Sequence, residues 1–158
     1  MKRGGKAYNT NVIVDRNGNV VGKQDKIYLA EGEEKLGITP GEKPLVFNTE
    51  FGKIGMITGL DIVNSVQNEQ ADMGAEIIFA ASTGDFTHLA KQAAKDLGVW
   101  MIFAGQDVNR NLAEEQQFDK SAIIDPGGNI VKSVTDGSCI RNAYNSEDGS
   151  YVNYIVEK

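Results

Sequence analysis

Residues 52 to 61 read Gly-Lys-Ile-Gly-Met-Ile-Thr-Gly-Leu-Asp, and this stretch decides the fold. Its apolar centre, Ile54 to Ile57, predicts a buried strand. The four residues from Thr58 to Asp61 predict a tight exit, because small residues at the end of a buried strand let the backbone turn sharply. Many α/β enzymes present a nucleophile at such an exit. Here the residue at the expected nucleophile position is glycine, Gly59.

Strands and helices alternate after this stretch. Residues 64 to 73 predict a helix capped by Asn64 or Ser65, and residues 76 to 81 form a continuous apolar run of strand length. Residues 85 to 97 have helical spacing, with Asp85 as N-cap and Gly98 just beyond the end. Residues 99 to 104 read as another buried strand. The order predicts an α/β fold with a layered sheet, and 158 residues suit a single domain over 1–158.

Two hairpins flank this core. The first joins strands at 7–14 and 20–26 through the turn at 15–19, and the second joins 121–124 and 130–134 through the turn at 125–129. Other segments are less regular. Residues 30–43 read as an acidic loop, 45–47 as a short strand, and 136–158 as a polar C-terminal tail whose alternating end, 151–156, adds a strand or strap to a neighbour.

Composition narrows the class of protein. The formal net charge is −6 and no basic patch stands out, which argues against nucleic acid and anionic membrane surfaces as partners. No apolar run is long enough to span a bilayer, and none follows the basic start as a signal peptide would require. The single cysteine, Cys139, rules out an internal disulfide framework. A cytoplasmic location is the default expectation.

Several motifs occur in an order and spacing that together are specific, although each is modest alone. They are Tyr8-Asn9-Thr10 with Asp15 and Gly18, Gly22 to Leu29 around Lys26, Thr39-Pro40-Gly41, Phe47-Asn48-Thr49, Phe51 to Gly55, Gly74 to Ile78, and Ser121 to Pro126 with Gly128. On these motifs the chain resembles the nitrilase superfamily of carbon–nitrogen hydrolases over about residues 7 to 135. The resemblance implies a partial nitrilase-type αββα sandwich.

The resemblance also implies a site. Members of the family use a Glu–Lys–Cys triad, in which the thiol attacks an amide or nitrile carbon and the lysine stabilises the developing oxyanion. The triad lysine carries over to Lys26, and an assisting acid carries over best to Glu34, with Glu33 as the neighbouring alternative. The cysteine belongs at Gly59. The family's glutamate precedes the Tyr-Asn-Thr motif, where this chain has almost nothing, so the chain is expected to lack the N-terminal part of the domain.

Other candidate residues have plainer interpretations. Gly59 itself suits a tight turn, and Asp61 suits a structural role in holding that turn through backbone hydrogen bonds. Cys139 lies far from Lys26 in sequence and no motif supports it as a relocated nucleophile, while His88 suits a surface or packing role on a helix. No metal-ligand spacing and no phosphate-binding loop is present, so we expect neither a metal nor another cofactor.

Three hypotheses for the function remain open. The leading one is an N-terminally truncated, inactive carbon–nitrogen hydrolase domain whose ancestral reaction was hydrolysis of a small amide, carbamoyl or nitrile compound. The second is a non-catalytic binding or assembly module that forms a homo-oligomer or pairs with a complementing chain. The third is that the parent protein is longer, which would restore the glutamate but not the cysteine. A small amide-like compound is the expected ligand.

Overall fold

The computed structural model describes residues 1–84, 86–105, 121–133, 138–144 and 151–157, the last two segments by their backbone alone. A six-stranded sheet forms its centre, in the order β10-β9-β8-β7-β6-β5. Strands β6, β7 and β8 run parallel, and β5, β9 and β10 pair antiparallel with their neighbours. The sheet strands are β5 (Val46–Thr49), β6 (Gly52–Thr58), β7 (Ile77–Ser82), β8 (Trp100–Gly105), β9 (Ala122–Ile124) and β10 (Ile130–Ser133).

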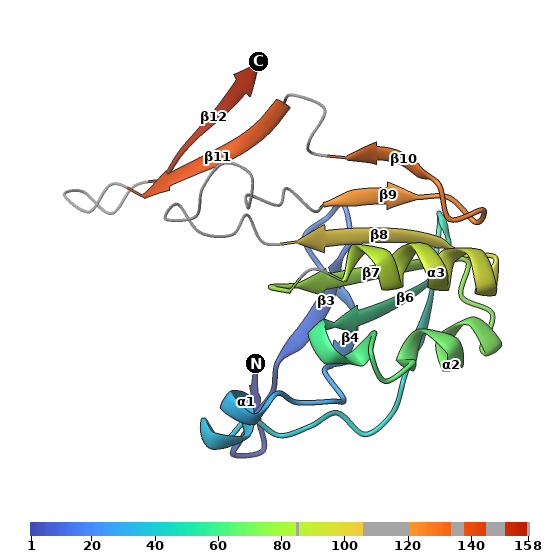
Figure 1. Cartoon of the computed structure of the whole chain (residues 1–158). Coiled ribbons are helices and arrows are strands. Elements are labelled where there is room, and N and C mark those ends of the chain that lie inside the picture. Colours follow the sequence, from blue (N-terminus) through green and yellow to red (C-terminus); the bar gives the residue numbers. More distant parts are fainter. Residues whose placement is uncertain (85, 106–120, 134–137, 145–150, 158) are drawn as a thin grey trace.

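Two helices make the crossovers between the parallel strands. Helix α2 (Val66–Asp72) joins β6 to β7, and α3 (Thr87–Leu97) joins β7 to β8. Both helices lie on the same side of the sheet (Figure 1) and bury the main apolar core against it. The fully buried Ile57, Ile78 and Phe103 belong to this core. The mixed α/β class expected from the sequence is therefore confirmed.

A two-stranded hairpin, β3 (Thr10–Val14) with β4 (Val20–Asp25), stands apart from the sheet's hydrogen bonds. Its turn forms because Asp15 accepts hydrogen bonds from the backbone N–H groups of Asn17 and Asn19, each at 2.8 Å. The hairpin packs on the side of the sheet opposite the helices, where Ile13 lines one groove together with Ile54 and Met56. Both hairpins predicted from the sequence are confirmed, the second as β9–β10.

Two predictions of secondary structure need correction. The expected strand at 7–14 is interrupted, since Ala7 belongs to β2 (Lys6–Ala7), which pairs with β1 (Lys2–Arg3) before β3 begins. The expected loop at 30–43 contains a short helix, α1 (Glu31–Lys35), because the Glu33 carboxylate accepts the backbone N–H of Ala30 and so closes its first turn. A helix of this length is too short to show periodicity in the sequence.

The ends of the longer helices also differ in detail. Helix α2 begins after Ser65, whose φ of 61° is left-handed, and α3 begins after Phe86, while Asp85 lies outside the described residues. Gly98 ends α3 in a left-handed conformation, as predicted. In the tail, the predicted final strand is β12 (Tyr151–Glu157), and it pairs with β11 (Ser138–Tyr144), a strand that the polar sequence did not indicate.

Candidate active site

A buried lysine forms the centre of the site. Lys26 directly follows β4, its backbone N–H donates to the Asn9 carbonyl at 2.8 Å, and the residue is only 6% exposed. Its ammonium is ion-paired with the Glu33 carboxylate of α1. Burying a charged group costs free energy unless an opposite charge compensates it, and here the Glu33 carboxylate compensates the buried Lys26 ammonium.

Glu33 has a complete set of partners. One carboxylate oxygen contacts Lys26 and also accepts the Ala30 backbone N–H at 2.9 Å, and the other accepts the Asn9 side-chain amide at 2.8 Å. Burial alone would raise the pKa of this carboxyl, but the hydrogen bonds from Ala30, Lys26 and Asn9 outweigh it and lower the pKa. Glu33 is therefore a fixed carboxylate.

Gly59 faces the lysine. It opens the 3₁₀ turn at Gly59–Asp61 that follows β6, with φ at +53°, a conformation that favours glycine. A Cβ placed on Gly59 would lie 3.2 Å from the Lys26 Nζ and 3.6 Å from its Cε. Any side chain at this position would project directly onto the ammonium. The structure thus brings Lys26 and Gly59 together, from segments that are distant in sequence.

Asp61 links the segment that follows Lys26 to the turn that contains Gly59. It is 1% exposed, and one of its oxygens accepts the backbone N–H groups of Ile27 at 3.1 Å and Tyr28 at 2.9 Å. The other oxygen accepts the Thr58 backbone N–H at 3.0 Å. Burial raises the pKa of Asp61, while these three backbone hydrogen bonds oppose the rise. The carboxylate fastens the chain after Lys26 to the turn that carries Gly59, as expected for a structural aspartate.

These residues border a cleft of about 600 Å³. One wall comes from Asn9, Lys26 and Glu33, and the other comes from the carboxyl ends of the parallel strands, with Thr58, Ser82 and Gly105. Ligands of open α/β sheets bind at the carboxyl ends of the strands. The cleft combines a fixed ammonium, a fixed carboxylate and hydroxyl groups, which suits a small polar compound with both an acceptor and a donor.

The remaining sequence candidates lie elsewhere. Glu34 is exposed, and it is Glu33 that meets Lys26. His88 is exposed on α3 and does not line the cleft, and the side chain of Cys139 lies outside the described residues. The contribution of Asn9 was not singled out from the sequence, although the Tyr-Asn-Thr motif that contains it carried the signal. Among the described residues, no group of three His, Cys, Asp or Glu side chains is placed to hold a metal ion.

The sequence profile of the carbon–nitrogen hydrolase family matches residues 1–139. The chain belongs to this family. Its sequence is 27% identical over 149 residues to the omega-amidase NIT3 of Saccharomyces cerevisiae, covering 84% of this chain and 50% of the relative. It is also 36% identical to human pantetheinase over 56 residues, covering 35% of this chain and 11% of that protein.

Solved structures show the same fold. The crystal structure of Saccharomyces cerevisiae Nit3, from the nitrilase superfamily, superposes with a TM-score of 0.68 at 22% identity over 95% of this chain and 53% of that one. An amidase from Nesterenkonia sp. AN1, a cysteine-to-alanine variant in complex with butyramide, matches with a TM-score of 0.66 at 20% identity over 94% and 54%. The chain therefore spans about half the length of the omega-amidase and of these structures.

Proposed function

We propose that this nitrilase-fold chain binds a small amide, carbamoyl or nitrile compound in its cleft and does not hydrolyse it. One observation carries the proposal: the residue that faces the Lys26 ammonium is Gly59, whose side-chain position lies 3.2 Å from the Lys26 Nζ and holds no nucleophile. In the related Nesterenkonia amidase, covalent addition occurs at an active-site cysteine. Losing one member of a catalytic triad can lower kcat by a factor on the order of 10⁶.

The rest of the site suits binding. The Lys26 ammonium donates to Glu33 and can also donate to a carbonyl oxygen or nitrile nitrogen in the cleft, as a charge-assisted hydrogen bond. The cysteine-to-alanine variant of the Nesterenkonia amidase was obtained in complex with butyramide, so in that protein binding does not need the thiol. The same separation of binding from reaction is proposed for this chain.

Binding is tested by titrating butyramide into the 158-residue chain and following the backbone amide resonances by NMR. We expect shifts in the residues around Lys26 and Gly59, and we expect Lys26→Met to abolish them. Glu34→Gln is the matched control, because Glu34 is an exposed neighbour of Glu33. Shifts that survive Lys26→Met would contradict the proposed binding mode.

Hydrolysis is tested separately by ammonia release from acetamide, butyramide and propionitrile. We expect no release above a protein-free control. Release that is lost in Cys139→Ala would show that the single cysteine is the nucleophile, and release that survives it would show another nucleophile. Either result would overturn the non-hydrolytic proposal.

The assignment of the nucleophile position is tested by Gly59→Cys in a Cys139→Ala background. A thiol beside the Lys26 ammonium has a lowered pKa and reacts faster with iodoacetamide. We expect alkylation at position 59, measured by mass spectrometry, to slow when Lys26→Met is added. An unchanged rate would mean that the two positions do not form one site.

A further inference from the structure

The hydroxyl group of Thr58 is held by a side chain of the first hairpin. Thr58 is the last residue of β6 and lines the cleft directly before Gly59. Its Oγ1 accepts a hydrogen bond from the side-chain amide of Asn11 at 2.7 Å. A hydroxyl group has one hydrogen to donate and accepts through its lone pairs, so this contact uses a lone pair and leaves the hydrogen available. Thr58 can therefore act as a hydrogen-bond donor in the cleft.

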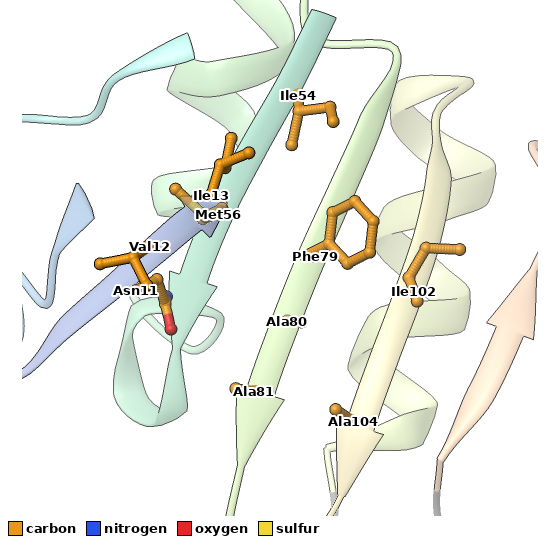
Figure 2. A pocket seen from close by; sticks show the side chains of 10 residues that line it. All are labelled: Asn11, Val12, Ile13, Ile54, Met56, Phe79, Ala80, Ala81, Ile102 and Ala104. Carbon is orange, nitrogen blue, oxygen red and sulfur yellow. The ribbon is translucent and has the colours of Figure 1, made fainter. Parts of the chain in front are cut away.

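Asn11 is a polar residue in an apolar place. It lies on β3 and borders the groove between the hairpin and the sheet, and the other described residues that line this groove are apolar. Figure 2 shows Asn11 beyond Met56, toward the carboxyl end of β6, where Thr58 follows. An amide at such a place costs free energy unless it is hydrogen-bonded, so the contact with Thr58 fixes both side chains.

Asn9 and Asn11 have the same role at two places on the cleft wall. Residues two apart in an extended strand lie on the same face, and both asparagines donate their side-chain amides toward the site. Asn9 donates to Glu33 at 2.8 Å, and Asn11 donates to Thr58 at 2.7 Å. The first contact holds the carboxylate that pairs with Lys26, and the second holds the hydroxyl group at the end of β6. One edge of the hairpin thus orients two different polar groups of the same cleft.

Lys26 supplies a second donor beside Thr58. An ammonium group carries three N–H donors, and among the described residues the side chain of Lys26 contacts one acceptor group, the Glu33 carboxylate. The side-chain position of Gly59, the residue after Thr58, lies 3.2 Å from the Lys26 Nζ. Both donors line the cleft, so they border the space that a side chain at position 59 would fill.

We propose that Lys26 and Thr58 together select a carbonyl compound, a primary amide or a carbamoyl compound, over a nitrile. This inference rests on the proposed function and narrows its class of ligand. A carbonyl oxygen has two lone pairs and accepts from both donors, whereas a nitrile nitrogen has a single lone pair along its bond axis and accepts well from only one. Glu33 accepts hydrogen bonds from Lys26, Ala30 and Asn9, which leaves a lone pair of its carboxylate for the amino group of an amide.

The experiment compares butyramide with butyronitrile, which has the same carbon skeleton, by NMR titration of the full 158-residue chain. The wild type should bind butyramide about 10-fold more tightly. Thr58→Val replaces the hydroxyl group by a methyl group and should remove most of this preference by weakening butyramide alone. Thr58→Ser keeps the hydroxyl group and should retain the preference. Asn11→Ala removes the group that orients Thr58 and should lower the ratio of the two affinities, which a purely structural loss would leave unchanged.

Thr49→Val is the matched control. Thr49 is half-buried like Thr58, but its hydroxyl group donates to the Gly52 carbonyl at 2.8 Å, at the opposite end of β6 from the cleft, so its loss should change neither affinity. Circular dichroism shows whether each variant keeps its fold. A wild type that binds both compounds equally, or a preference that survives Thr58→Val, would overturn this inference and leave the proposed function standing. A wild type that binds neither compound would overturn both.

Discussion

The ion pair of Lys26 and Glu33 differs in burial from the ion pair of Lys35 and Glu31 on α1, the short helix that also contains Glu33. Side-chain exposures are 6% and 21% for Lys26 and Glu33, against 73% and 83% for Lys35 and Glu31. Because the Lys26–Glu33 pair is largely buried, loss of either partner leaves the other charge uncompensated and poorly hydrated, which lowers stability. The second pair is exposed to water on both sides and contributes little.

The first prediction follows from this contrast. Lys26→Met should lower the free energy of unfolding by about 1–3 kcal/mol, since it leaves the Glu33 carboxylate without its cation. Lys35→Met should change it by less than about 0.5 kcal/mol. Urea denaturation measures both, and equal effects would mean that the Lys26 pair is as hydrated as a surface pair.

The second prediction concerns acid stability. The folded-state pKa of Glu33 is lowered, so its stabilisation is complete above the unfolded value of about 4.3 and is lost as the pH falls through the lower folded value. Glu33→Gln should therefore be less stable than the wild type near neutral pH, and the gap should narrow below about pH 4. Unfolding by urea at several pH values between about 3 and 7 measures this gap.

Glu34→Gln is the control for the pH experiment, since that neighbouring side chain is exposed. Its curve should follow the wild type. Burial raises the pKa of Asp61, which gives a pH dependence of the opposite sign, but Asp61 is present in every protein compared, so its contribution cancels in the difference. A gap between wild type and Glu33→Gln that stays constant down to about pH 3 would contradict the lowered pKa of Glu33.

At the scale of elements, Gly98 after α3 and Gly128 in the β9–β10 turn require glycine for different reasons. Gly98 ends α3 with φ at +66° and has open space where a Cβ would be. Gly128 in the β9–β10 turn has φ at +80°, and a Cβ there would lie 2.9 Å from the Lys91 carbonyl oxygen and 3.1 Å from the Lys95 Cβ. The first needs glycine for its backbone conformation alone, and the second also needs it for the close approach of hairpin and helix.

The third prediction compares these two positions. Gly98→Ala should cost about 1 kcal/mol of stability from the left-handed conformation alone. Gly128→Ala should cost about 1 kcal/mol more than that, because the added methyl group also pushes the hairpin away from α3. Thermal or urea unfolding of both variants measures the difference. Equal losses would show that the contact with α3 relaxes without cost.

Local signals were sufficient for most elements. The apolar run of β7 and the Asp-Arg-Asn-Gly-Asn turn of the first hairpin, residues 15–19, are encoded within a few residues, so both were predicted. Helix α1 was missed because it is stabilised by contacts of Glu33 with Lys26 and Asn9, which its own five residues do not contain. Strand β11 was missed because its partner β12 is a separate segment further along the chain.

At the scale of the whole molecule, the described elements cover the two faces of the central sheet unequally. Helices α2 and α3 cover the face on which Ile78 is 0% exposed, whereas Phe79 on the opposite face is 43% exposed. Separately, none of the helices in the described part of the chain has the length and apolar character needed to cross a membrane.

The sequence by itself determined the strands of the central sheet, the two hairpins, the glycine at position 59 and the apolar character of β7 and β8, because each depends on residues close together in the chain. Only the tertiary structure decided that Glu33 rather than Glu34 meets Lys26, and that the described crossover helices α2 and α3 cover the same face of the sheet. Adjacent residues of a helix point about 100° apart, so a difference of one position turns a carboxylate from the cleft to the solvent. Packing against the rest of the fold sets which carboxylate points to the cleft, and the sequence of a single helical turn does not encode that packing.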